Sequence, residues 1–188
     1  QWKRAWYYPK NNETMHDAVQ RESKAARNSA GILDASTLGK IDIQGTDASE
    51  FLNRVYTNAW SKLAIGKCRY GLMLNEDGMV YDDGVTTRLD ENHYIMTTTT
   101  GGAANVLGKL EDYLQTEWPE LDVYLSSVTD HYATASICGP NSKKILNKLI
   151  PDLDLSDESF PHMSFKNAKI NNIKCRIMRI SFTGEHSY

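Results

Sequence analysis

A strand–turn–strand pattern near the middle of the chain constrains the fold more than any other feature. Two runs of residues that favour strands, 70–74 and 79–87, flank the turn sequence Asn-Glu-Asp-Gly at 75–78. A short turn of this composition joins neighbouring antiparallel strands, so the two runs are expected to pair with each other. Any fold for this chain therefore has to contain an antiparallel sheet.

Helical and strand patterns alternate along the rest of the chain. Ile41 and Ile43 alternate with polar residues, which indicates a half-buried strand over 40–44. The other predicted elements are helices at 14–28, from 46, at 103–116 and from 139, and strands at 93–99, 121–125, 132–138 and 170–180. Hairpins mixed with helices are typical of the α+β class, so we predict mixed or antiparallel sheets with packed helices.

Length and composition are those of an ordinary globular protein. The 188 residues are 40% hydrophobic and 24% charged, with a formal net charge of −3, which allows one sizeable core or two small ones. We expect residues 1–188 to form one module, with the aromatic-rich segment 1–12 packing onto it. The chain starts without Met and stops soon after a Thr-Gly-Glu turn, so we expect it to belong to a longer polypeptide.

Several classes of function are disfavoured by the residues themselves. Acidic and basic residues are interspersed, which argues against a nucleic-acid surface, and no apolar run approaches the roughly 20 residues of a membrane span. Cys68, Cys138 and Cys175 lie far apart and no two histidines have ligand spacing, so no metal site is expected. Reduced, widely spaced cysteines without a secretory signal favour a cytoplasmic protein.

Asp83 is the main candidate for a functional side chain. The predicted strand places two sets of side chains on opposite faces: Met79, Tyr81, Asp83 and Val85 on one, and Val80, Asp82, Gly84 and Thr86 on the other. A carboxylate within a mostly apolar line is a natural general base or ligand anchor if it faces a cavity. The alternative is that Asp83 stabilises a local turn with Gly84. Asp82 is expected to hydrogen-bond locally and to set the shape of the strand.

The threonine run 97–100, followed by Gly101 and Gly102, is a second candidate. Hydroxyls and glycine amides at the junction of a strand and a helix can bind a polar ligand. The alternative is a β-branched strand that simply ends at glycines. The glycines of the chain lack the spacing of a phosphate loop or a dinucleotide-binding fingerprint.

Four segments of the chain form a recognisable set: 31–36 (GILDAS), 70–83 with its Asp-Asp pair, 138–141 (CGPN) and 181–185 (SFTGE). Taken together, they resemble segments of the T-proteins of the glycine-cleavage system, which are aminomethyltransferases. Further segments resemble the C-terminal region of the α subunits of heterotetrameric sarcosine oxidases. These are 2–9 (WKRAWYYP), 33–40 (LDASTLGK), 56–60 (YTNAW) and 111–119 (EDYLQTEWP). The resemblance implies a T-protein-like folate-binding fold that is present only in part.

The resemblance also implies roles for individual residues. Asp83 matches the acidic group next to the folate and would be the catalytic residue. Tyr70 matches the strand tyrosine that lines the site, and Val85 follows Asp83 on the same face. Phe182 stands where the family usually has a tyrosine before Thr-Gly-Glu, and Thr98 where it often has an asparagine near the pterin. We therefore expect Tyr70, Val85, Thr98 and Phe182 to contact folate.

The function implied by the resemblance is that of a tetrahydrofolate-binding module of sarcosine oxidase. Such a module transfers the one-carbon unit of an imine, made by oxidation of sarcosine, to tetrahydrofolate and yields methylenetetrahydrofolate. FAD, FMN and NAD would bind only elsewhere in the complex, and the isolated module would be inactive. The implied partners are the other subunits and the N-terminal part of the same subunit, with no nucleic acid and no membrane.

Two alternatives stay open at the level of the sequence. One is a stand-alone aminomethyltransferase, against which the Trp- and Tyr-rich N-terminal segment and the run at 111–119 argue. The other is a non-catalytic module with the folate-binding fold that serves subunit assembly, in which the N-terminal aromatic residues would form an interface.

Overall fold

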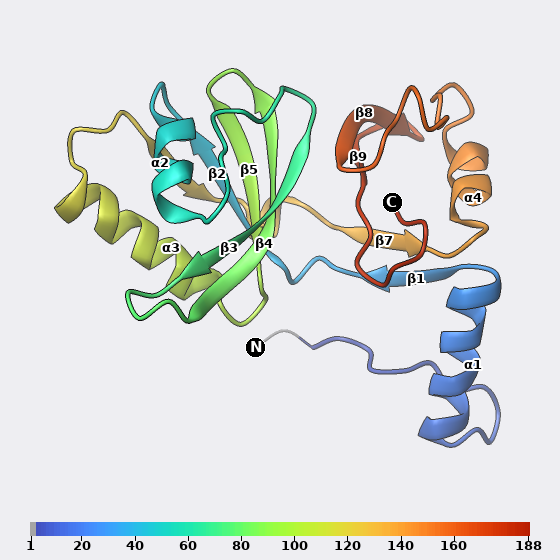
Figure 1. The fold of residues 1–188 in the computed structure, drawn as a ribbon. Coiled ribbons are helices and arrows are strands. Elements are labelled where there is room, and N and C mark those ends of the chain that lie inside the picture. Colours follow the sequence, from blue (N-terminus) through green and yellow to red (C-terminus); the bar gives the residue numbers. More distant parts are fainter. Residues whose placement is uncertain (1–2) are drawn as a thin grey trace. The chain divides into compact units, whose positions relative to one another are not determined.

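The computed structural model describes residues 3–188 and contains two compact units (Figure 1). Unit 1 is formed by the chain up to Ala35 together with Thr134–Tyr188, and unit 2 by Ser36–Ala133. Each unit contains its own cluster of buried apolar side chains. Of the two possibilities that the length allows, one core or two smaller ones, the chain therefore adopts the second.

Unit 2 is built on a five-stranded antiparallel sheet in the order β3-β4-β5-β2-β6. The strands are β2 (Gly39–Gln44), β3 (Cys68–Leu74), β4 (Val80–Asp90), β5 (His93–Thr98) and β6 (Tyr124–Ser127). The hairpin predicted from the sequence is β3–β4, and Gly78 in its turn has a φ of +80°, a conformation that favours glycine. The α+β class and the antiparallel pairing are thus confirmed.

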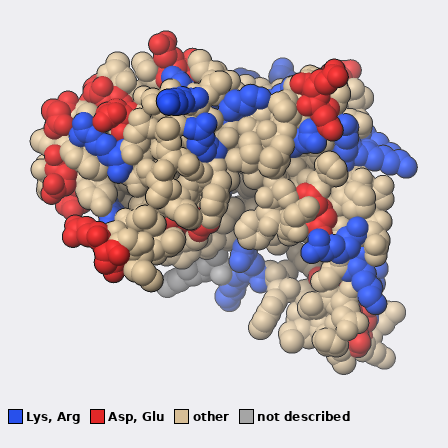
Figure 2. All heavy atoms as spheres, in the orientation of Figure 1, with Lys and Arg blue, Asp and Glu red and all other residues tan. Residues whose placement is uncertain are grey.

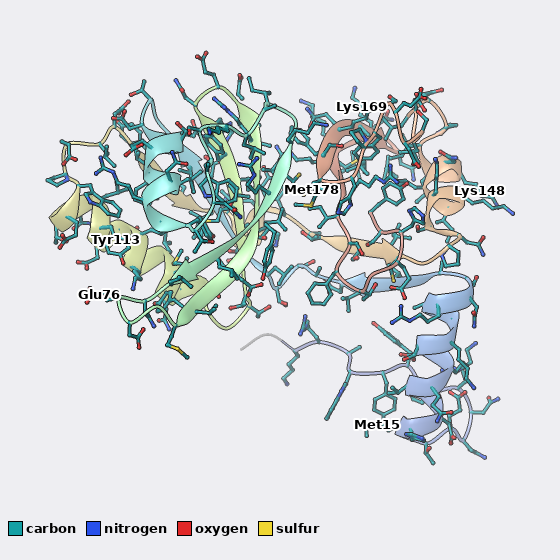
Figure 3. The ribbon with its side chains drawn as sticks, in the orientation of Figure 1. Met15, Glu76, Tyr113, Lys148, Lys169 and Met178 are labelled. Atoms are coloured by element: carbon teal, nitrogen blue, oxygen red, sulfur yellow. The ribbon has the colours of Figure 1, made fainter. Side chains whose placement is uncertain are left out.

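Two helices pack on one face of this sheet (Figure 1), which we call the core side; the opposite face is the outer side. They are α2 (Ala48–Val55) and α3 (Ala103–Asp112), and α3 runs into a π-helical turn, η1 (Tyr113–Glu117); Figure 3 shows Tyr113 there. A 3-10 turn, η2 (Thr129–His131), follows β6. The buried side chains of this core are Ile41, Ile43, Ala48, Phe51, Leu52, Val55, Tyr56, Trp60, Leu63, Met73, Tyr94, Met96, Val106 and Leu110. Burying each large apolar side chain contributes about 1.5–3 kcal/mol.

The start of α2 is stabilised by a long-range contact. Asp47 stands at the N-terminal cap, a position where aspartate often bonds the helix backbone, but it makes no capping hydrogen bond. Its carboxylate instead accepts a hydrogen bond from the backbone N–H of Asp122 at 2.9 Å. A contact between residues far apart in the chain has replaced the local one.

A β-bulge in β4 changes the faces on which its first residues lie. Met73 pairs with Asp82 and Leu74 with Val80, so Tyr81 is an extra residue on β4. Tyr81 packs against the core of unit 2, and the ammonium of Lys109 on α3 lies 4.5 Å from the centre of its ring. The prediction that Tyr81 shares a face with Asp83 is therefore wrong, because strict alternation does not hold across a bulge.

Unit 1 consists of a helix, two small antiparallel sheets and a second helix. Its elements are α1 (Met15–Asn28), β1 (Gly31–Asp34), β7 (Ala135–Cys138), α4 (Ser142–Leu149), β8 (Ser164–Ile170) and β9 (Ile173–Arg179). Strand β1 pairs with β7, and β8 pairs with β9. Thr14 caps α1 in a capping box with Asp17, which satisfies backbone donors at the start of the helix.

The last residues of the chain add to the β1–β7 sheet. Ile137 and Tyr188 exchange two backbone hydrogen bonds of 2.8 and 2.9 Å, and the N–H of Gly139 donates to the carbonyl of His186 at 2.9 Å. Residues 186–188 thus lie antiparallel to β7 and are held there by their backbone. Figure 1 shows this segment returning from the end of β9 to β7.

Replacement of Gly71 by alanine is expected to destabilise unit 2. A Cβ atom at this position would lie 2.7 Å from the ring of Trp60 and 2.8 Å from that of Tyr56, both in the core. Such overpacking costs about 1–3 kcal/mol in the free energy of unfolding, which urea titration measures.

Gly108→Ala is the matched control, because a Cβ atom added to Gly108 in α3 would meet nothing within 4 Å apart from its chain neighbours and the nearby backbone of its own helix. Alanine there should stabilise the helix by about 0.5–1 kcal/mol. Equal effects of the two substitutions would contradict the packing described for Gly71.

Candidate functional site

Asp83 and Tyr70 meet on the face of the unit 2 sheet that is turned away from its core. Met73 and Gly71 of β3 face the core side, so their neighbours Tyr70 and Leu72 face the opposite, outer side. Leu72 pairs with Asp83, and Tyr70 pairs with Val85. The hydroxyl of Tyr70 donates a hydrogen bond to Oδ2 of Asp83 at 2.7 Å. The structure thus brings together three of the five residues predicted for the site.

The two hydrogen-bonded groups are unequal in exposure. Tyr70 is exposed, whereas Asp83 and Val85 are half-buried. The hydrogen bond to Asp83 raises the pKa of the Tyr70 hydroxyl, and partial burial and the charge of the carboxylate act in the same direction. Tyr70 is therefore a stable hydrogen-bond donor. Among the described residues no donor reaches the other oxygen of Asp83, Oδ1, which is thus open to another group.

Asp82 hydrogen-bonds within the fold, but to a residue 17 positions away and not locally as the sequence analysis expected. It is 5% exposed, on the core side of the sheet. Its carboxylate accepts hydrogen bonds from the hydroxyl of Thr99 at 2.6 Å and from the N–H of Thr99 at 3.2 Å. The N–H of Gly102 in turn donates to the Thr99 hydroxyl at 3.1 Å. Asp82 therefore ties β4 to the turn between β5 and α3.

The threonine run is a structural junction. The hydroxyl of Thr97 accepts from the N–H of Val85 at 2.9 Å and donates to its carbonyl at 3.1 Å, in place of a backbone pair between β5 and β4. The hydroxyls of Thr99 and Thr100 are bonded to Asp82 and to Thr37. Since these hydroxyls already have partners, the geometry favours a strand that ends in local hydrogen bonds over a free ligand-binding cluster.

Thr98 and Phe182 are not part of the Asp83 cluster. Thr98 is 2% exposed, lies on the same side of β5 as the core residue Met96, and donates to the carbonyl of Thr99 at 2.9 Å. Phe182 belongs to unit 1 and is 89% exposed there, next to a Thr-Gly-Glu turn in which Gly184 has a φ of +88°. Its ring is thus open to contact with another molecule or segment.

Thr97 and Leu72 are neighbours of the cluster that the sequence did not single out. Thr97 contacts the backbone of Val85, and Leu72 is the cross-strand partner of Asp83. The pairing of Leu72 with Asp83 follows from the hairpin register, which a bulge makes hard to infer from the sequence. Alternation alone could have placed Leu72 on the same face as Tyr70, two residues away.

Within residues 3–188, neither the surface charge nor a grouping of metal ligands marks a further site. Figure 2 shows both signs of charge interspersed on the visible surface. Within residues 3–188 no three His, Cys, Asp or Glu side chains are grouped so that they could hold a metal ion. None of the helices in this range is long and apolar enough to cross a membrane.

The family model of the GCVT N-terminal domain matches residues 1–188. The chain belongs to this family. The α subunits of sarcosine oxidase from Corynebacterium sp. (strain U-96) and from Rhizobium meliloti are 56% and 49% identical to it over its whole length. The aminomethyltransferase of Listeria monocytogenes is 33% identical over 90% of the chain.

The chain spans only part of these relatives. It covers 20% and 19% of the two sarcosine oxidase subunits and 45% of the aminomethyltransferase. Among solved structures, the glycine-cleavage aminomethyltransferase T of Bartonella henselae superposes with a TM-score of 0.77 and 25% identity over 90% of this chain and 44% of that one. A chain of the heterotetrameric sarcosine oxidase of Corynebacterium sp. U-96 shares the fold, with a TM-score of 0.57 and 16% identity over 92% of this chain and 80% of that one.

Asp83→Asn should lower the pKa of Tyr70 toward its ordinary value, because the substitution removes the carboxylate that stabilises the protonated hydroxyl. A pKa raised in the folded state means that the folded protein binds this proton more tightly. The resulting stabilisation is complete below the unfolded pKa of about 10 and is lost as the pH rises above it. Titration of ¹³Cζ-labelled tyrosine by NMR measures the shift, and Glu76→Gln, in the exposed hairpin turn of Figure 3, should leave it unchanged.

Asp82→Ala should lower the free energy of unfolding by about 2 kcal/mol, because it removes charge-assisted hydrogen bonds from a buried junction. Glu76→Ala is a matched acidic control at an exposed position and should change stability by less than about 0.5 kcal/mol. If thermal and urea denaturation gave the same small change for both variants, Asp82 would not be the anchor of this junction.

Proposed function

We propose that this module binds tetrahydrofolate on the outer side of the unit 2 sheet, and that Asp83 accepts and returns a proton during one-carbon transfer. The observation that carries the proposal is the hydrogen bond of 2.7 Å between Tyr70 and Asp83, on a half-buried face beside Val85. Membership of the GCVT N-terminal domain family and the similarity to named aminomethyltransferases support it.

The residues of the cluster fit a flat heteroaromatic amine. Tyr70 offers an exposed aromatic ring and Val85 a small apolar surface, while Asp83 offers a free carboxylate oxygen. A ring that packs on Tyr70 and Val85 can direct an N–H group at Oδ1 of Asp83. Charge-assisted hydrogen bonds of this kind contribute about 1.5–3 kcal/mol. The folate contacts expected for Thr98 and Phe182 are not part of this proposal for the outer side, because Thr98 is buried on the core side of the sheet and Phe182 belongs to unit 1.

For the proposed one-carbon transfer, the protein has to orient the reactants and to transfer protons. When bound, tetrahydrofolate supplies two N–H nitrogens that take up the carbon of an imine, and the two protons they lose end on the departing amine. Asp83 is placed to accept one of these protons at Oδ1 and to return it, while Tyr70 holds Oδ2. The half-buried face strengthens the interaction of the carboxylate with a developing cation.

The similarity to sarcosine oxidase α subunits leads us to propose the source of the imine. In this proposal a flavin bound elsewhere in a larger cytoplasmic complex oxidises sarcosine, and the other subunits and the N-terminal part of the same subunit are the partners of this module. FAD, FMN and NAD are not assigned to residues 1–188. A named relative of known structure is a heterotetramer, in line with several partners.

A role in subunit assembly is the second candidate, and the N-terminal aromatic residues favour it. Trp6 and Tyr8 are large apolar side chains that are exposed in unit 1. The backbone of Tyr8 is fixed to α1, since its N–H donates to Glu22 and its carbonyl accepts from Arg21. Aromatic side chains held in place at the surface are typical of protein interfaces.

Calorimetric titration of tetrahydrofolate into the chain tests the catalytic proposal. We expect binding to the unmodified chain, and weakening by about tenfold in Asp83→Asn, which keeps the shape of the side chain but removes its charge. Tyr70→Phe keeps the ring and should weaken binding less. Glu76→Gln makes the same change of charge in an exposed turn. As the control, it should leave the affinity for tetrahydrofolate unchanged.

The same substitutions in a full-length relative separate the two candidates. Loss of methylenetetrahydrofolate formation in Asp83→Asn with intact assembly supports catalysis. Normal product yield in Asp83→Asn, with assembly lost in a double variant of Trp6 and Tyr8 to serine, would favour the assembly role.

A further inference from the structure

Unit 1 contains a small pocket that the proposed function does not use. Its volume is about 240 Å³, and it is lined by His162, Arg179, Ser181, Gly184, Glu185, His186 and Ser187. These residues come from the end of β9, the Thr-Gly-Glu turn, the segment that pairs with β7 and the loop before β8. The pocket is smaller than the roughly 300–1,000 Å³ of sites for drug-sized ligands, so its size suits a molecule of few atoms.

The walls of the pocket are fixed by hydrogen bonds. The hydroxyl of Ser181 donates to the carbonyl of Glu185 at 2.8 Å and accepts from the N–H of Gly184 at 3.0 Å, which closes the Thr-Gly-Glu turn. The hydroxyl of Ser142 donates to the carbonyl of His186 at 3.1 Å. Together with the pairing of residues 186–188 to β7, these bonds form the site before any ligand binds.

Arg179 supplies a positive charge with unused donors. The residue is 8% exposed, and its Nη1 donates to the carbonyl of Phe160 at 2.7 Å and pairs with Asp157 at 2.9 Å. No hydrogen bond joins Nε or Nη2 to another described residue, and neither atom is among the buried atoms that lack a partner, so both are open to solvent. Asp157 is 76% exposed, so its pairing with Arg179 is screened by water. A buried guanidinium with open donors is a ready site for a carboxylate.

Glu185 supplies a negative charge in the same pocket. Its Oε1 pairs with Arg27, whereas its Oε2 is buried and has no hydrogen-bond partner among the described residues. The hydroxyl of Thr183 and the charge of Arg27 lower the pKa of this carboxyl group, so it is ionised at neutral pH. An unpaired buried carboxylate oxygen is costly unless a donor reaches it.

We propose that this pocket binds a small zwitterion, with its carboxylate at Arg179 and its protonated amine at Glu185. The buried, unpaired oxygen of Glu185 and the solvent-open donors of Arg179 belong to groups of opposite charge that line one cavity, and a molecule with a single charge would satisfy only one of them. An amino acid of the size of glycine or N-methylglycine has both groups. The proposal does not depend on folate binding, since none of the residues that line the pocket belongs to unit 2.

Titration of the ¹⁵N-labelled chain by NMR at constant ionic strength tests the proposal. Glycine and N-methylglycine should shift the amides of Gly184 and Ser187, and acetate and methylammonium should each bind about tenfold more weakly than glycine, because each lacks one of two charged contacts. No shift at these amides, or the same shift with sodium chloride, which would indicate an adventitious ion only, would overturn it.

Two variants separate recognition from loss of structure. Glu185→Gln should reduce the affinity for glycine to that for acetate and leave the affinity for acetate unchanged, whereas Arg179→Lys should weaken both, with the fold checked from the remaining amide shifts. Glu158→Gln, on the exposed loop before β8, is the matched control and should bind glycine normally. An equal loss of glycine and acetate binding in Glu185→Gln would contradict the proposed role of Glu185.

Discussion

The anchoring of Asp82 by the turn after β5 is the interaction on which the geometry of unit 2 depends. Among the described residues of β4, Asp82 is the only carboxylate on the core side of the sheet. It accepts two hydrogen bonds from Thr99. This contact fixes β4 just after the bulge at Tyr81 and thus sets which residues face outward. Because a shift of one residue moves every side chain of a strand to the opposite face, the position of Asp83 follows from this anchor.

The proposed site and its support are thus two sides of one strand. On the outer side Asp83 accepts a hydrogen bond from Tyr70 through one oxygen, and its other oxygen is the one proposed to meet a ligand, while on the core side Asp82 has its hydrogen bonds made within the fold. The division follows from environment: a buried carboxylate needs partners at all times, whereas a half-buried one tolerates an open position that water fills. Two adjacent acids of the same type therefore have different environments, one structural and one open to the role proposed for Asp83.

Unit 1 depends more on backbone hydrogen bonds than on a large apolar core. Its core is small, and much of its order comes from backbone pairing of β1, β7 and residues 186–188. The sequence does not predict strand β8, because Lys166, Asn167 and Lys169 interrupt its apolar pattern, and its pairing with β9 alone defines it. Short ribbons with polar faces carry weak sequence signals, whereas the alternation and turn at 69–87 identified the main hairpin.

By itself, the sequence determined the α+β class, the central hairpin and the likeness to the aminomethyltransferase family, because periodicity, turn chemistry and motif order can be recognised without the tertiary structure. Only the tertiary structure decided that Tyr81 turns to the core, that Thr98 lies away from Asp83, and that Arg179 and Glu185 line one pocket. These outcomes depend on a bulge and on contacts between residues distant in the chain, whose free energies no local pattern records.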